Sequence, residues 1–145
     1  MFEKYRDHGL LLLRIGIGVM FVLHGWPKVA GGPEFWAKIG GAMGNFGIGF
    51  APTFWGLMAA LAEFGGGILL ALGLFARPAA ASMAFTMLVA TTVHLSMGEG
   101  FKGASHAMEL GIVFLALVFV GPGRLSLDAF RARRSHAATL AAHGA

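Results

Sequence analysis

The chain has 145 residues, of which 57% are hydrophobic and only 12% are charged, with a formal net charge of +4. A water-soluble domain carries about 25% charged residues, because its surface must be hydrated. Seven acidic and eleven basic side chains are too few to cover a globular domain of this length, and the mean hydropathy of +0.72 agrees. These values exclude a soluble enzyme, a disordered linker and a nucleic-acid-binding domain. They predict an all-α, polytopic membrane protein that uses the lipid bilayer as its solvent.

Cysteine is absent from the chain. This absence excludes disulfides, thiolate metal sites, iron–sulfur clusters, covalent c-type haem and dithiol redox chemistry. Any electron transfer would therefore depend on a bound cofactor or on a partner protein.

Apolar windows long enough for a membrane helix occur four times along the chain. A helix needs about 20 mainly apolar residues to cross the hydrocarbon of a bilayer. We expect membrane helices over residues 9–25, 53–76, 78–98 and 105–121, which together form one four-transmembrane-helix bundle. Pro78 suits the first turn of the third helix, and Pro122 suits a stop after the fourth. Residues 9–25 are expected to be a retained helix and not a cleaved signal peptide. The reason is that Arg14 lies inside the stretch that would form the apolar core of the signal peptide.

The segments between the spans suggest an orientation in the membrane. Residues 26–52, rich in glycine and phenylalanine, are expected to be an outer interfacial loop or a short re-entrant helix, and residues 124–145 a basic tail on anionic lipid. Basic residues on the side of both termini are Lys4, Arg6, Arg77, Arg124, Arg131, Arg133 and Arg134, against Lys28, Lys38 and Lys102 on the other side. Because cytoplasmic segments carry the excess of basic residues, both termini are expected in the cytoplasm.

The second and fourth spans share a short pattern, Glu63-Phe-Gly and Glu109-Leu-Gly, each followed by Leu-Ala-Leu. His24 and His94 lie near the outer ends of the first and third spans. Two parallel helical-hairpin repeats would explain this pattern. Chance would also explain it, because short strings of glycine, leucine and alanine recur in membrane helices. A true duplication would place two Glu/His pairs at matching depth.

Arg14 and Glu63 are ionisable side chains inside apolar spans. Each such group costs about 2.5–3.5 kcal/mol on insertion scales, so it must be paired, hydrated or functional. One interpretation is a structural ion pair between Arg14 and Glu63 that fixes the register of two helices. The other makes both side chains part of a polar pocket for a small ligand.

Three histidines, His24, His94 and His106, also lie in or beside the spans. Each one taken alone is most simply an interfacial side chain hydrated by water. Together with Glu63 and Glu109 they predict a proton relay in the outer half of the bundle, because histidine titrates near neutral pH.

Some of the same side chains are also of the types that ligate haem or metal ions. His24 and His94 could ligate haem b from separate helices, but two histidines are weak evidence, and haem b is not expected. His106-x-x-Glu109 has the spacing of metal ligands on a helix. Because no third and fourth ligand accompany it, no metal is expected.

Two motifs of this chain resemble those of the DoxX family of small four-helix membrane proteins. The first is LLRIGIG at residues 12–18 followed by FVLHG at 21–25 and by Lys28. The second is EFGGGILLALGL at residues 63–74, followed by Arg77, and Glu109 fits a third, acidic position. The likeness covers about residues 8–128.

This resemblance implies a location in the bacterial inner membrane and a link to quinone chemistry. Some relatives are linked to the membrane subunit of thiosulfate:quinone oxidoreductase, and others to membrane complexes that handle thiol and oxidative stress. Since the thiosulfate enzyme needs a second, soluble subunit or domain, the resemblance also implies a redox partner. The family positions carried over to this chain are Arg14, His24, Lys28, Glu63, Arg77 and Glu109.

The leading hypothesis is a quinone-interacting or anchoring subunit of a membrane oxidoreductase assembly. Candidate catalytic residues, which would move protons, are Glu63, His94 and Glu109, and candidate ligand-binding residues are Arg14, His24, Lys28 and His106. The alternatives are a small-molecule carrier or exporter that uses the same pocket, and a non-catalytic assembly factor for a redox partner.

Overall fold

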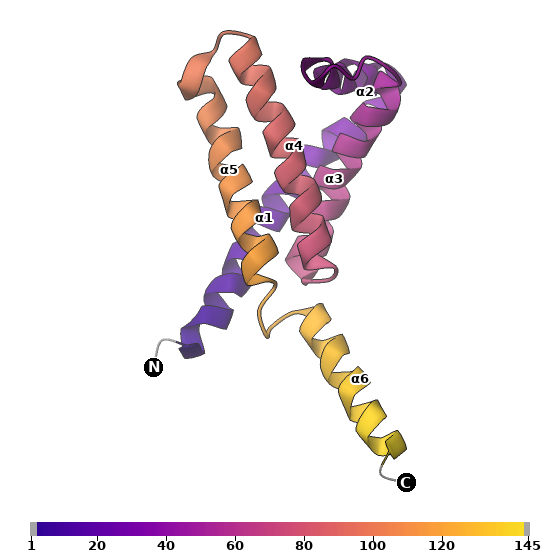
Figure 1. The fold of residues 1–145 in the computed structure, drawn as a ribbon, viewed down its shortest axis with the longest axis vertical. Coiled ribbons are helices and arrows are strands. Elements are labelled where there is room, and N and C mark those ends of the chain that lie inside the picture. Colours follow the sequence, from indigo (N-terminus) through magenta and orange to yellow (C-terminus); the bar gives the residue numbers. More distant parts are fainter. Residues whose placement is uncertain (1–2, 144–145) are drawn as a thin grey trace.

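The computed structural model describes residues 3–143, and within them the chain forms helices and no strand (Figure 1). The elements are α1 (Glu3–Ala30), α2 (Gly32–Gly40), the 3₁₀ helix η1 (Gly41–Phe46), α3 (Pro52–Leu72), α4 (Ala76–Ser96), α5 (Gly100–Val120) and α6 (Leu127–His143). Four of them, α1, α3, α4 and α5, are long and apolar enough to cross a membrane. The prediction of an all-α protein with four membrane spans is confirmed.

The observed helices differ from the expected ranges mainly at their ends. Helix α1 starts at Glu3 and continues through Pro27 to Ala30, beyond the expected 9–25. Helix α5 starts at Gly100, earlier than the expected 105. Residues 26–52, expected as a loop or a short re-entrant helix, continue α1 and then form α2 and η1. Much of the tail is helix α6, which extends beyond the four long helices at the end where they meet (Figure 1).

Helices α1 and α3 pack together along their lengths, and glycine makes this possible. A Cβ atom on Gly18 would lie 2.6 Å from the carbonyl oxygen of Gly67, and one on Gly67 would lie 2.7 Å from the carbonyl oxygen of Gly18. Only glycine allows two helix backbones to approach this closely. The close approach brings the outer end of α1 against the middle of α3.

Helices α4 and α5 form a second pair, and α4 also packs on α3. Side chains from all four long helices fill the inner half of the bundle, including the buried Leu70, Met83, Phe114 and Leu117. Phe21 of α1 meets Phe114 of α5 edge to face, with the ring centroids 4.9 Å apart. Beyond this contact the two helix pairs diverge toward their outer ends (Figure 1).

Arg14 is fully buried and holds the inner end of the bundle together. One guanidinium nitrogen donates to the carbonyl oxygen of Leu70 at 3.2 Å, and the other donates to that of Leu125 at 2.7 Å. The last carbonyls of a helix lack partners within it and carry partial negative charge, so the C-terminal end of α3 attracts this cation. The predicted alternative of an Arg14–Glu63 ion pair is therefore wrong.

Asp128, in the first turn of α6, secures the turn between α3 and α4. Its carboxylate accepts hydrogen bonds from the backbone N–H groups of Phe75 and Ala76, at 2.9 and 3.0 Å. Its own N–H donates to the carbonyl oxygen of Gly73 at 2.9 Å. Asp128 thus caps the N-terminus of α4 from another helix, at the end where negative charge is favourable.

Replacing Arg14 with methionine tests its role at the inner end. Arg14→Met removes the charged donors to the carbonyls of Leu70 and Leu125, so we expect the free energy of unfolding in mixed micelles to fall by about 3 kcal/mol, as the loss of two hydrogen bonds from a charged group predicts. Arg14→Lys keeps the charge but lacks the two terminal nitrogens of a guanidinium group, so an intermediate loss of stability is expected. The exposed Arg6 on the same helix is the control, and Arg6→Ala should change little. Equal stability of Arg14→Met and Arg6→Ala would contradict this role.

Candidate functional site

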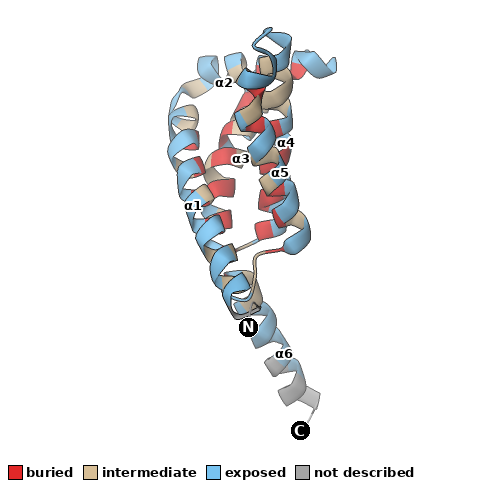
Figure 2. Cartoon of the chain, turned by 90° about the vertical axis from the view of Figure 1, so that its left-hand side faces the viewer, coloured by how far each residue is buried: buried red, intermediate tan, exposed pale blue. Residues whose placement is uncertain are grey.

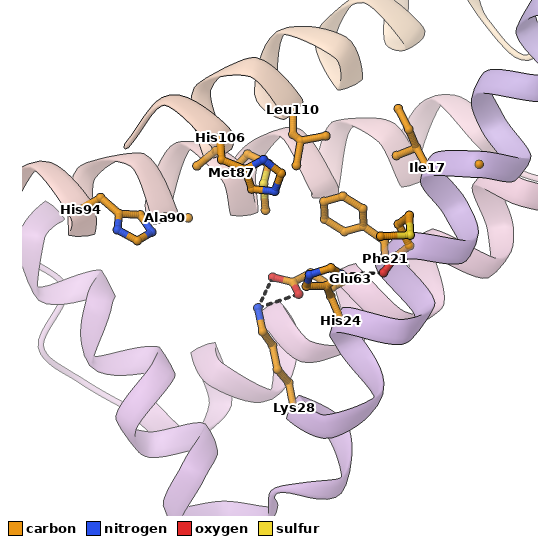
Figure 3. Close-up of a pocket in the computed structure, with 13 residues that line it drawn as sticks. Ile17, Phe21, His24, Lys28, Glu63, Met87, Ala90, His94, His106 and Leu110 are labelled. Atoms are coloured by element: carbon orange, nitrogen blue, oxygen red, sulfur yellow. Dashed lines mark hydrogen bonds and ion pairs between the residues drawn. The ribbon is translucent and has the colours of Figure 1, made fainter. Parts of the chain in front are cut away.

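A cavity of about 410 Å³ lies between the α1–α3 pair and the α4–α5 pair, in the outer half of the bundle (Figure 3). Its inner part is apolar and includes Ile17, Phe21, Met87 and Leu110. The polar side chains that line it are His24, Lys28, Glu63, His94 and His106. The structure therefore brings five of the seven candidate residues to one cavity.

Lys28 and Glu63 form an ion pair on the wall of this cavity. The Lys28 ammonium lies 2.6 Å from each of the two Glu63 carboxylate oxygens. The Glu63 side chain is 4% exposed, and that of Lys28 is 33% exposed. Glu63 is held in place by α3, whereas Lys28 reaches it from the last turn of α1, beyond Pro27. The pair neutralises a carboxylate that would otherwise be costly at this depth.

His24 lies on α1, one turn before Lys28, and its ring is oriented by its own helix. Its Nδ1 lies 2.8 Å from the backbone carbonyl oxygen of Met20. Because a carbonyl oxygen only accepts, Nδ1 carries the hydrogen in this contact, and Nε2 of a neutral His24 is the acceptor. Figure 3 shows the ring beside Glu63.

His94 is oriented by Glu99, a residue that the sequence reasoning missed. Nδ1 of His94 lies 2.7 Å from Oε2 of Glu99, in the turn between α4 and α5. Both side chains are partly exposed, at 40% and 46%. A carboxylate hydrogen-bonded to Nδ1 fixes the orientation and tautomer of an imidazole. The only sequence signal for this pair is the spacing of five residues across a predicted turn.

His106 of α5 lines the wall opposite the Lys28–Glu63 pair, and His94 lies on its side of the cavity (Figure 3). His106 is exposed. No hydrogen bond or ion pair of this side chain is found within residues 3–143. Its ring nitrogens are therefore available to a ligand in the cavity.

Arg14 and Glu109, two of the seven candidate residues, do not line the cavity. Arg14 lies at the inner end of the bundle, and Glu109 lies on an exposed face of α5, one turn beyond His106. Glu63 is buried, so the two glutamates of the suggested repeat have different surroundings. Arg77, a family position, is also at the inner end, where it contacts the carbonyl oxygen of Phe119 at 3.5 Å.

The cavity combines an apolar floor with donors and acceptors from separate helices. Such a lining suits a small molecule with one apolar and one polar part. In the described part of the chain, no group of three or more histidine, aspartate or glutamate side chains converges as metal ligands would.

Comparisons with known proteins agree with the helical membrane fold. The family model of DoxX matches residues 9–95. The chain is 34% identical over 131 residues to inner membrane protein YqjF of Escherichia coli K12, covering 87% of this chain and 94% of the relative. It is 36% identical over 132 residues to an uncharacterized protein of Haemophilus influenzae, covering 87% and 92%. Inner membrane protein YphA of Escherichia coli K12 is 28% identical over 142 residues, covering 86% and 96%. No solved structure gives a significant match.

A double-mutant cycle tests the Lys28–Glu63 pair. Lys28→Met strands a buried carboxylate and should lower the free energy of unfolding, whereas adding Glu63→Gln should restore part of the loss. We expect a coupling energy of about 1–2 kcal/mol, because Lys28 keeps a third of its surface exposed. Lys38→Met, at an exposed lysine of α2, is the control and should change little. Additive effects of the two substitutions would contradict the ion pair.

Proposed function

The chain belongs to the DoxX family and is a multi-pass membrane protein, and on this premise we propose that its cavity binds the head group of a membrane quinone. The protein would serve as the quinone-interacting subunit of a membrane oxidoreductase assembly. The observation that carries the proposal is the Lys28–Glu63 ion pair on the wall of an otherwise largely apolar cavity.

The size and lining of the cavity support a quinone. A volume of about 410 Å³ lies in the range of small-molecule sites, about 300–1,000 Å³. A quinone ring offers apolar faces and two carbonyl oxygens that only accept hydrogen bonds. Phe21, Met87 and Leu110 supply apolar contacts, and nitrogen donors are present on both walls.

Lys28 is suited to donate to one quinone carbonyl. An ammonium group has three N–H donors, and two of them point to the Glu63 oxygens. The third remains for a ligand, and the partly exposed side chain allows Lys28 to reach it. His106 would donate to the second carbonyl from the opposite wall.

His94 and Glu63 are the residues that we assign to proton movement. His94 can hold a proton on Nδ1, beside the Glu99 carboxylate, and exchange another at Nε2. Glu63 can take a proton from Lys28 or from the ligand when the ion pair is disturbed. When bound, a quinone supplies two-electron, two-proton redox chemistry. Because the chain has no cysteine, the electrons would come from another bound cofactor or from a partner protein.

Charge supports a cytoplasmic position of both termini. The arginines outside the four candidate membrane spans all follow α5, at the end opposite the cavity. They are Arg124, Arg131, Arg133 and Arg134. With the basic end in the cytoplasm, the cavity would lie in the periplasmic half of the inner membrane.

A carrier function has less support. A carrier needs a path that can open to both sides of the membrane. In this bundle Leu70, Met83 and Phe114 fill the space between the cavity and the inner end, and each of them is fully buried.

His106 offers the cleanest test, because its side chain supports no other group of the described structure. We expect His106→Ala to weaken binding of a short-chain quinone to protein in nanodiscs about tenfold, as the loss of one hydrogen bond predicts. Quenching of tryptophan fluorescence reports the binding, since Trp26 packs on Phe64 beside Glu63.

His136→Ala is the matched control, because His136 is an exposed histidine of α6 outside the cavity. It should bind the quinone as the wild type does. Absence of quinone binding to the wild type, or equal affinity of the wild type and His106→Ala, would refute the proposed function.

A further inference from the structure

The cavity has one side on which no helix covers it. Helix α1 packs along α3, and α5 packs along α4, while α3 and α4 pack on each other. Helices α1 and α5 do not pack along one another, and their aromatic contact is that of Phe21 with Phe114 at the base of the cavity. Figure 2 shows α1 and α5 on opposite sides of the bundle. The cavity therefore opens sideways between these two helices.

Gly16 lies at the edge of this opening. It lines the cavity and is also exposed. A Cβ atom at this position would meet no other atom within 4 Å. Met20, one turn further along α1, is 53% exposed, and Leu110 lines the α5 side. The rim is thus apolar, in contrast to the polar outer end with Lys28 and His106.

The depth of Gly16 decides what the opening faces. The membrane span of α1 runs over Tyr5–Ala30, and Gly16 lies near its middle. At this depth the surroundings of the bundle are lipid hydrocarbon. An apolar chain that leaves the cavity here stays in hydrocarbon and exposes no surface to water.

We propose that the ligand of this cavity carries a long apolar chain, and that the chain leaves sideways between α1 and α5, past Gly16, into the bilayer. This inference rests on the proposed function and narrows it to a lipid-dissolved, long-chain quinone. A cavity of about 410 Å³ holds a head group but not an isoprenoid chain of many units. Glycine at position 16 would then serve to leave room for that chain.

A comparison of two quinones with the same head group tests this proposal. One has a long isoprenoid chain, the other a chain of one unit, and both are titrated as mole fractions of the lipid in nanodiscs. Gly16→Leu places an apolar side chain in the opening, and because its Cβ atom would meet no other atom of the protein within 4 Å, the variant should fold. We expect Gly16→Leu to weaken binding of the long-chain quinone at least tenfold more than binding of the short-chain quinone.

Gly9→Leu is the matched control, two turns earlier on the same helix, where a Cβ atom also meets nothing within 4 Å. It should bind both quinones as the wild type does. Unchanged long-chain binding in Gly16→Leu, or equal weakening of both quinones, overturns the sideways path but leaves the proposed function intact. Failure of the wild type to bind either quinone overturns both the sideways path and the proposed function.

Discussion

The candidate site depends on the need to neutralise one buried carboxylate. Glu63 lies within an apolar helix of the membrane span, where an unpaired charge costs several kcal/mol. Lys28 neutralises it, and can do so only because α1 continues past Pro27 and because Gly18 and Gly67 let α1 and α3 touch. The neutralisation of Glu63 therefore depends on the approach of these two helices and on the extra turn of α1, and the resulting ion pair forms the polar wall of the cavity.

The charges inside the bundle divide into two kinds, according to what satisfies them. The two terminal nitrogens of Arg14 donate to backbone carbonyls at the inner end, and Asp128 accepts from backbone N–H groups of the neighbouring turn. Such charges hold helices together and offer nothing to a ligand. Lys28 and Glu63 neutralise each other and still face a cavity, and one N–H donor of the Lys28 ammonium group is left for a ligand. This difference separates the structural charges from those that we assign to function.

The sequence was sufficient to predict the four spans, because apolar windows of that length have few other uses. It also singled out His24, Lys28, Glu63, His94 and His106, which line one cavity, since ionisable groups near apolar spans require an explanation. It could not assign Arg14 or Glu109, because the rotation of each helix about its axis depends on packing between helices. Glu99 was missed because a glutamate in a predicted turn is ordinarily hydrated, and its contact with His94 depends on how the turn folds.

The most direct measurement is the infrared difference spectrum of the protein in bilayers with and without bound quinone. Isotope-labelled glutamate and the Glu63→Gln variant together assign the carboxylate band of Glu63. If the quinone head group binds beside the Lys28–Glu63 pair, this band shifts when quinone is added, and the shift is absent in Glu63→Gln. Saturation of the protein with quinone while the Glu63 band stays unchanged would contradict the account, because the ligand would then lie away from the ion pair.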